Sequence, residues 1–370
     1  FWVMETDPEF GHPKGFLAME HFAAYVSGAE GVSYWLWRKH PSGVEMRHGS
    51  VLAACGKKTR GWQEAEKAAA LRQRLEPILS DYHPAPASCA LVRSFANGME
   101  MLEVESLPHL NYYQELQQHH RAIYANGNFC DVLYDNDPRS LEAYALVSTP
   151  LIPHLEDTFV LKLAEWVKAG GTWILGPLSS YRAEGLTAPC DYLWGAVSKH
   201  LDIEPDFIDY PKDPNAADIS LRTADGSPMQ FKEMTVVSAQ HCSFDSPATA
   251  LAVYEGGFNA GESAIAVHRR GKGRVITIGC QCPTPVLQTI FAFALGEAGL
   301  PILEIPEGVT MVPHRKADGS PALALYEWGG HHAQVQLASP GQDLLSRERF
   351  GEKVDIEPFG VRFIAIEPEQ

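Results

Sequence analysis

An acidic residue near the start of the sequence has the position expected of a catalytic group. The segment FWVMETDP places Glu5 directly after a short apolar run, a pattern typical of a buried parallel strand. In barrels of parallel strands, catalytic side chains lie at the carboxyl ends of the strands. We therefore predict that Glu5 acts as a nucleophile or general base. The alternative is a solvated carboxylate at the end of a strand.

A second group of candidate residues follows the next apolar run, at residues 32–37. There YWLWRKHPSGVEMRHGS presents Trp37 and Arg38, and then Glu45 and His48 as an E-x-x-H pair. Such a pair can lie on one face of a helical turn and hold a metal or sugar hydroxyls, while the Trp ring stacks on a sugar. Two ligands are too few for a zinc site, so we predict no metal here. An ordinary surface turn is the alternative.

Other catalytic arrangements are poorly supported in the rest of the chain. Ser148 follows an apolar run but lacks the glycines of a G-x-S-x-G turn, and the adjacent pair His119-His120 points in two directions. The segment RGKGRVITIG lacks the spacing of a phosphate-binding loop, so we predict a hairpin turn. An amidotransferase or peptidase would need a Cys or Ser elbow beside a His. We predict no cofactor.

Composition restricts the class of protein and its partners. The 370 residues carry a formal net charge of −16, which disfavours nucleic acid and anionic membranes as partners. No apolar run approaches the roughly 20 residues that span a bilayer. The seven cysteines are odd in number and form no C-x-x-C pair, which predicts reduced thiols and a cytoplasmic location. Cys280 and Cys282 are interpreted as packing residues.

Hydrophobic patterns divide the chain into three predicted segments of an α/β protein. Residues 1–86 read as strand, helix, strand, loop and helix, ending in a Pro-Ala-Pro linker. Residues 87–300 alternate strands and helices, which predicts a mostly parallel sheet covered by helices. Residues 301–370 contain short β runs and no convincing helix, which predicts a small antiparallel β-sandwich.

Five motifs, taken in order, resemble glycoside hydrolase family 42, the β-galactosidases, over essentially the whole length. They are FWVMETDP, GAEGVSYWLWRKHPSGVEMRHGSVL, LAEWVKAGGTWILGP, GKGRVITIG and PFGVRFIAIEP. The resemblance implies that residues 1–86 are the last two βα units of a (β/α)8 barrel. It implies that residues 87–300 form a flavodoxin- or glutamine-amidotransferase-like domain used for trimer assembly, and that residues 301–370 form the sandwich.

The resemblance also implies roles for the candidate residues. Glu5 matches the catalytic nucleophile of the seventh barrel strand. Glu45 and His48 match the pair that holds galactose hydroxyls, and Trp37 and Arg38 match the Trp-Arg of the eighth strand. The implied reaction is retaining hydrolysis of terminal β-D-galactosides by a homotrimer, in which a second carboxylate about 5 Å from the nucleophile acts as acid and base.

Two departures from the family pattern limit this prediction. The family's acid/base Glu follows an Asn, and the 370 residues contain no Asn-Glu dipeptide. The loop after Glu5 also lacks the family's Trp. We therefore expect the C-terminal part of a longer glycosidase that lacks about six βα units and is inactive alone. The alternatives are an α-L-arabinopyranosidase and a non-catalytic assembly or carbohydrate-binding protein.

Overall fold

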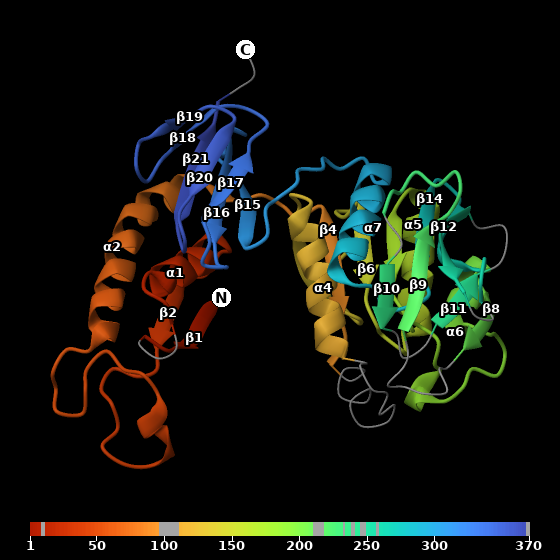
Figure 1. Ribbon diagram of the computed structural model, residues 1–370, viewed down its shortest axis with the longest axis horizontal. Coiled ribbons are helices and arrows are strands. Elements are labelled where there is room, and N and C mark those ends of the chain that lie inside the picture. The colour runs from red at the N-terminus through yellow and green to blue at the C-terminus, as the bar shows by residue number, and fades with distance from the viewer. Residues whose placement is uncertain are drawn as a thin grey trace. The chain divides into compact units, whose positions relative to one another are not determined.

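The chain folds into two compact units. One unit contains residues 1–86 and 303–370, and the other contains residues 87–302. The computed structural model describes residues 1–8, 12–95, 111–209, 218–231, 234–237, 241–244, 249–256 and 259–367, shown as coloured ribbon in Figure 1. The first and third predicted segments thus contribute to the same unit.

The first part of unit 1 is a strand–helix–strand arrangement followed by a long helix. Its elements are β1 (Trp2–Thr6), α1 (Phe16–Val26), β2 (Gly31–Tyr34), the short 3-10 turn η1 (Val44–Arg47) and α2 (Arg60–Asp81). β1 and β2 pair in parallel, with Trp2 opposite Gly31 and Thr6 opposite Tyr34. α2 begins after Thr59, whose side chain accepts a hydrogen bond from the Gly61 amide, a typical N-cap. The order predicted from the sequence is confirmed.

The second part of unit 1 is antiparallel. Its strands are β3 (His83–Pro84), β15 (Val309–Arg315), β16 (Pro321–Glu327), β17 (Ala333–Gln336), β18 (Gly341–Asp343), β19 (Arg349–Phe350), β20 (Lys353–Ile356) and β21 (Val361–Ile366). Six of them form a sheet in the order β19-β18-β21-β16-β15-β3, and β17 pairs with β20. All these pairs are antiparallel, as the sequence predicts.

This six-stranded sheet buries both faces, because successive residues of a strand point to opposite sides. Val312 and Phe363 pack with residues of α1 and α2, such as Phe22. Their neighbours Met311 and Ile364 pack with residues of β17 and β20 instead. Helices α1 and α2 therefore cover one face of the sheet, a contact that the sequence analysis did not predict.

Unit 2 is built around a nine-stranded mixed sheet. Its strands are β4 (Cys89–Arg93), β5 (Cys130–Tyr134), β6 (Leu146–Thr149), β7 (Thr172–Leu175), β9 (Asp218–Thr223), β10 (Met234–Val237), β12 (Thr249–Glu255), β13 (Ser263–Arg270) and β14 (Gly273–Ile278). They run in the order β10-β9-β12-β13-β14-β7-β6-β4-β5. A separate ribbon pairs β8 (Pro205–Asp209) with β11 (His241–Phe244).

The prediction of a mostly parallel sheet is wrong for half of this sheet. The pairs from β14 to β5 are parallel, whereas those from β10 to β14 are antiparallel. The predicted hairpin at RGKG is confirmed, since Arg270 pairs with Gly273. Such tight turns join strands that run in opposite directions, so this half of the sheet cannot be parallel. The sequence analysis missed β8 to β12.

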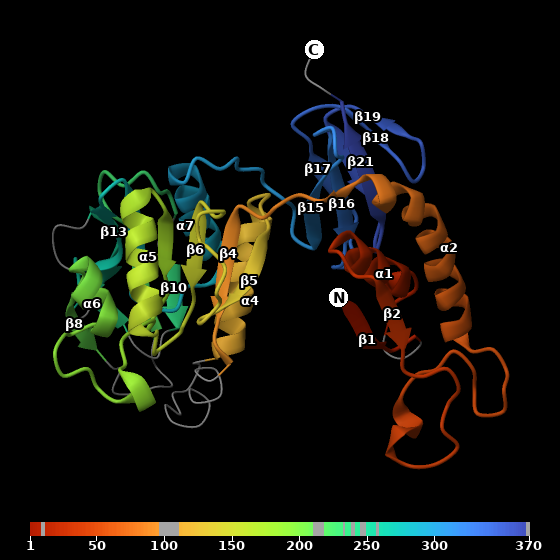
Figure 2. The same ribbon diagram turned by 180° about the vertical axis from the view of Figure 1, so that it is seen from behind.

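Helices cover both faces of the nine-stranded sheet. They are α4 (Tyr112–Ala125), α5 (Asp157–Ala169), α6 (Gly195–Leu201) and α7 (Thr284–Glu297), with a 3-10 turn η3 (Glu184–Leu186). α4 and α7 lie on the face seen in Figure 1, and α5 and α6 lie on the face seen in Figure 2. Among the described residues, no helix is both long and apolar enough to cross a membrane.

Four of the six cysteines whose side chains the structure describes are buried thiols. Cys89, Cys130, Cys280 and Cys282 are buried and free, whereas Cys55 and Cys190 are free and exposed. The sulfur atoms of Cys280 and Cys282 are 3.9 Å apart, within the apolar core under α7. This position agrees with their predicted role in packing.

Two titratable side chains of α4 are completely buried against the sheet. Glu115 and His119 are one helical turn apart. The ring Nδ1 of His119 lies 2.8 Å from the hydroxyl of Ser148, and a carboxylate oxygen of Glu115 accepts a hydrogen bond of 3.2 Å from Gln281. Burial lowers the pKa of His119 to about 3 and raises the pKa of Glu115 to about 7. Both groups are therefore held in their neutral forms in weak acid.

The buried Glu115 is expected to make the chain less stable as the pH rises. Between its usual pKa of 4.5 and about 7, the folded chain holds the proton and the unfolded chain does not. The free energy of unfolding therefore falls by about 3 kcal/mol across this window because of this group. Glu115→Gln should remove this part of the slope in urea unfolding measured from pH 4.5 to 8. The exposed Glu165→Gln serves as control, and equal slopes in both variants would contradict the expectation.

Candidate functional site

The side chain of Glu5 projects from β1 on the face opposite α1. Thr6 is buried, and its hydroxyl donates a hydrogen bond to Glu20 of α1, so Thr6 faces the helix. Its partner in the strand pair, Tyr34, faces the same way, with its ring 5.3 Å from that of His21. The pairing register of β1 and β2 shifts between Val3 and Thr6, so side chains do not alternate strictly there, and Met4 and Glu5 are both exposed, unlike Thr6. The carboxylate of Glu5 therefore lies at the carboxyl end of the parallel pair, away from the helical side.

The side chains of Tyr34 and His21, on the α1 side of the two strands, are neutral near pH 7. Burial, with the nearby Tyr25 and Glu20, raises the pKa of Tyr34 to about 12. Burial, with the positive charge of Arg72, lowers the pKa of His21 to about 4. These groups therefore act in packing and bring no cation to the Glu5 side of the strands.

A loop after β2 is fixed to the strand that carries Glu5. Its base is closed by two backbone hydrogen bonds, from Leu36 to the Gly49 carbonyl (3.3 Å) and from Val51 to the Leu36 carbonyl (3.1 Å). In addition, the carboxylate of Asp7 accepts a hydrogen bond of 3.0 Å from the Gly49 amide. Asp7 is two residues beyond Glu5, so this contact ties the loop to the end of β1.

Two of the predicted residues lie at the start of this loop. The exposed ring of Trp37 packs near that of Trp62 on α2, with centroids 5.9 Å apart. The guanidinium of Arg38 donates two hydrogen bonds, of 3.0 and 2.6 Å, to the Ala54 carbonyl. Trp37 therefore offers a supported aromatic surface, whereas Arg38 holds a neighbouring turn in place.

The predicted pair Glu45 and His48 lies farther along the loop. Glu45 is in the turn η1, and His48 ends it, with its amide bonded to the Glu45 carbonyl at 3.0 Å. The carboxylate of Glu45 lies 3.3 Å from the ring of His40. The sequence analysis missed His40, Asp7 and Trp62 as contributors, because loop closure and not periodicity brings them to their partners.

The strand end and the loop together present acids, imidazoles and indole rings. Carboxylates and imidazoles can accept and donate hydrogen bonds to hydroxyl groups, and exposed tryptophan rings can stack on an apolar sugar face. Within the described ranges, no group of three or more His, Cys, Asp and Glu side chains could hold a metal ion.

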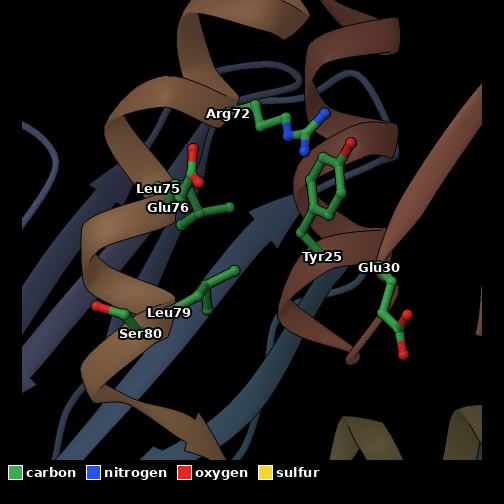
Figure 3. Close-up of a pocket in the computed structure, with 7 residues that line it drawn as sticks. All are labelled: Tyr25, Glu30, Arg72, Leu75, Glu76, Leu79 and Ser80. Atoms are coloured by element: carbon green, nitrogen blue, oxygen red, sulfur yellow. The ribbon is translucent and has the colours of Figure 1, made fainter.

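A groove of about 310 Å³ lies elsewhere in unit 1, between α1 and α2 (Figure 3). Its lining residues are Tyr25, Glu30, Arg72, Leu75, Glu76, Leu79 and Ser80. Glu30 directly precedes β2, so the groove lies at the amino end of the parallel strands. Catalytic groups of parallel barrels lie at the other end, where Glu5 is located. The groove is therefore separate from the candidate site.

A carboxylate at the carboxyl end of a parallel strand, followed along the chain by a loop that carries tryptophan rings and a further acid, is typical of glycoside hydrolases. Comparison with known proteins gives the family. A family model described as β-galactosidase trimerisation domain matches residues 87–301, more than half of the chain, and one described as β-galactosidase matches residues 1–75. The chain belongs to glycoside hydrolase family 42, as its motifs predict.

Relatives with this likeness include bacterial β-galactosidases. The β-galactosidase YesZ of Bacillus licheniformis is 28% identical over 381 residues, covering 99% of this chain and 55% of the relative. YesZ of Bacillus subtilis is 27% identical, covering 94% of this chain and 52% of the relative. The chain thus spans about half the length of the curated relatives it matches.

Solved structures share the fold. The β-galactosidase from Bacillus circulans sp. alkalophilus superposes with a TM-score of 0.86 at 21% identity. The match covers 99% of this chain and 55% of that structure. The chain therefore shares its fold with the matching part of this β-galactosidase.

Proposed function

We propose that this chain supplies the nucleophile, the sugar-binding loop and the assembly domain of a retaining β-galactosidase. The main supporting observation is the position of Glu5 at the carboxyl end of β1, opposite α1, with a loop tied to the same strand through Asp7. Glu5 attacks the anomeric carbon, and Glu45 and His48 hold sugar hydroxyls. Trp37 stacks on the sugar, and Arg38 positions the neighbouring turn.

The proposal includes the (β/α)8 origin of residues 1–86, the α/β domain of residues 87–300 and the sandwich of residues 301–370. The parallel pair of β1 and β2, joined through α1, is the connection that a βα barrel uses. Trp2 and Met4 of β1 are exposed, like Glu5. Large apolar side chains on a sheet face are normally covered, which supports further strands against this face.

Retaining hydrolysis needs a second carboxylate, about 5 Å from the nucleophile, that protonates the leaving oxygen. The chain contains no Asn-Glu dipeptide, the family's position for this group. We therefore propose that the acid/base is not among these 370 residues and that they do not hydrolyse galactosides by themselves. The match of residues 87–301 to a trimerisation domain supports a homotrimer as the assembled form.

Activity assays of two proteins test this function. The chain alone is expected to give no turnover of an aryl β-D-galactoside. A chimaera in which this chain replaces the matching part of the B. licheniformis relative is expected to hydrolyse it, and to prefer it to the aryl α-L-arabinopyranoside. The unaltered relative and a cooperative melting curve of the chimaera serve as controls. Turnover by the chain alone would contradict the proposal that these 370 residues are inactive by themselves. A preference of the chimaera for the arabinopyranoside would contradict the proposed galactoside specificity.

A further inference from the structure

The carboxylate of Glu45 belongs to a turn that gives its side chain little support. The turn η1 has four residues, and none of them is buried. Backbone hydrogen bonds from Met46 to the Gly43 carbonyl (3.2 Å) and from His48 to the Glu45 carbonyl (3.0 Å) fix the course of the main chain. They leave open the direction of the Glu45 carboxylate, because a glutamate side chain rotates about its own bonds. A carboxylate that binds one particular sugar hydroxyl therefore needs a further contact to orient it.

The backbone of His40, earlier in the same loop, is held on both sides. The amide of the preceding Lys39 donates a hydrogen bond of 2.9 Å to the Leu52 carbonyl, and the Leu52 amide donates one of 2.8 Å to the Trp37 carbonyl. The following residue is Pro41, and a proline restricts the residue before it to extended conformations. His40 therefore starts from a fixed backbone position.

The imidazole of His40 connects the Glu45 carboxylate to the end of the parallel strands. Its Nε2 lies 3.3 Å from Oε2 of Glu45. Its ring lies 6.1 Å from that of Trp35, whose amide donates a hydrogen bond of 3.0 Å to the Thr6 carbonyl, next to Glu5. Among the described residues, the structure records no other ion pair or hydrogen bond of the Glu45 carboxylate. His40 is therefore the contact that can orient this carboxylate.

The contact between His40 and Glu45 is suited to orientation and not to stability. The two side chains are 45% and 47% exposed, and ion pairs with this exposure add little to the stability of a fold. The contact uses Oε2 of Glu45, so Oε1 can accept a hydrogen bond from a sugar hydroxyl. One oxygen of the carboxylate thus fixes its direction while the other faces a ligand.

We propose that His40 is a positioning residue of this site, which holds the Glu45 carboxylate in the orientation that binds a sugar hydroxyl. The inference rests on the proposed function, in which Glu45 binds sugar hydroxyls, and it adds a residue that acts through Glu45 without touching the sugar. The hydroxyl that Glu45 binds is not a reacting group. The contribution of His40 is therefore the same for the bound substrate and for the transition state.

Steady-state kinetics of the chimaera test this role. His40→Ala should raise KM for the aryl β-D-galactoside about fivefold and leave kcat within about twofold, because binding common to both states is lost. His40→Gln should keep KM within about twofold of the unaltered chimaera, since its amide group can donate to the carboxylate as the imidazole does. Ser42→Ala, exposed in the same loop, is the control and should leave both constants unchanged. Thermal melts of all three variants should coincide, because the contact is half exposed.

A double-mutant cycle distinguishes positioning from direct binding of the sugar by His40. Glu45→Ala is expected to raise KM at least about tenfold, because a charged hydrogen-bond acceptor is lost. Adding His40→Ala to this variant should change KM by less than about twofold, since His40 then has no carboxylate to hold.

The possible outcomes separate this inference from the proposed function. An unchanged KM in His40→Ala, no recovery in His40→Gln, or losses that add in the double variant would overturn the inference while Glu45 keeps its role. An unchanged KM in Glu45→Ala, or a folded chimaera without turnover, would overturn the proposed function and this inference together.

Discussion

Glu5→Gln in the chimaera is expected to lower kcat for an aryl β-galactoside by at least about 10³-fold, which corresponds to about 4 kcal/mol of transition-state stabilisation. Glutamine keeps the size and most hydrogen bonds of the side chain but cannot attack the anomeric carbon. Because Glu5 is exposed at a strand end, this substitution should leave the fold and the melting temperature unchanged. Steady-state kinetics at several substrate concentrations measure the effect.

A smaller substitution at the same position gives a stereochemical test. In Glu5→Gly, azide can enter the space of the missing carboxylate and attack the anomeric carbon in a single displacement. The bond to the leaving oxygen then breaks with protonation by the acid/base, and the product is the α-galactosyl azide, with inverted configuration. Nuclear magnetic resonance identifies the anomer.

The control for both substitutions is Glu30→Gln. Glu30 is an exposed acid at the amino end of β2, in the groove of Figure 3, and its replacement should leave kcat within about threefold. Near-normal turnover by Glu5→Gln, or a β-galactosyl azide from Glu5→Gly, would exclude Glu5 as the nucleophile.

The largest expected effect on stability is at Glu327, at the end of β16. Its side chain is completely buried, and its carboxylate accepts three backbone hydrogen bonds, from Gly329 (2.6 Å), Gly330 (2.9 Å) and Phe359 (2.9 Å). These contacts hold the turn after β16 against the turn before β21. The ring of Phe359 lies 5.8 Å from that of Phe16 at the start of α1. Glu327 thus links the C-terminal sheet to the helix that follows the Glu5 strand.

Glu327→Ala is expected to lower the free energy of unfolding of unit 1 by about 4 kcal/mol, because three donors lose their acceptor and a cavity is left. Glu327→Gln should cost about half as much, since one oxygen remains but the amide group faces other donors. Urea unfolding followed by tryptophan fluorescence, to which the adjacent Trp328 contributes, measures the loss.

The matched control for this stability effect is Glu357→Ala, in the same pair of turns but with an exposed side chain. It should change the free energy of unfolding by less than about 0.5 kcal/mol. Equal losses in Glu327→Ala and Glu357→Ala would show that the carboxylate of Glu327 does not hold the turns.

The amino-acid sequence by itself determined those features that depend on local pattern. Strands β15, β16 and β21 and helices α2 and α5 follow from apolar periodicity, and the RGKG hairpin follows from its turn residues. The family also follows from the sequence, because its motifs are contiguous. The strand end at Glu5 is recognisable for the same reason: four apolar residues and an acid are adjacent in the chain.

Only the tertiary structure decided which distant segments meet. The guanidinium of Arg74 donates a hydrogen bond of 2.9 Å to the Leu345 carbonyl, 271 positions away. The residues around Arg74 in the sequence do not predict this partner. The bonds of Asp7 to Gly49 and of Glu45 to His40 depend on how a long loop closes. The antiparallel half of the unit 2 sheet, β10 to β13, likewise gains its stability from neighbouring strands. Such contacts depend on packing and hydrogen bonding between distant elements, so a local pattern of residues does not predict them.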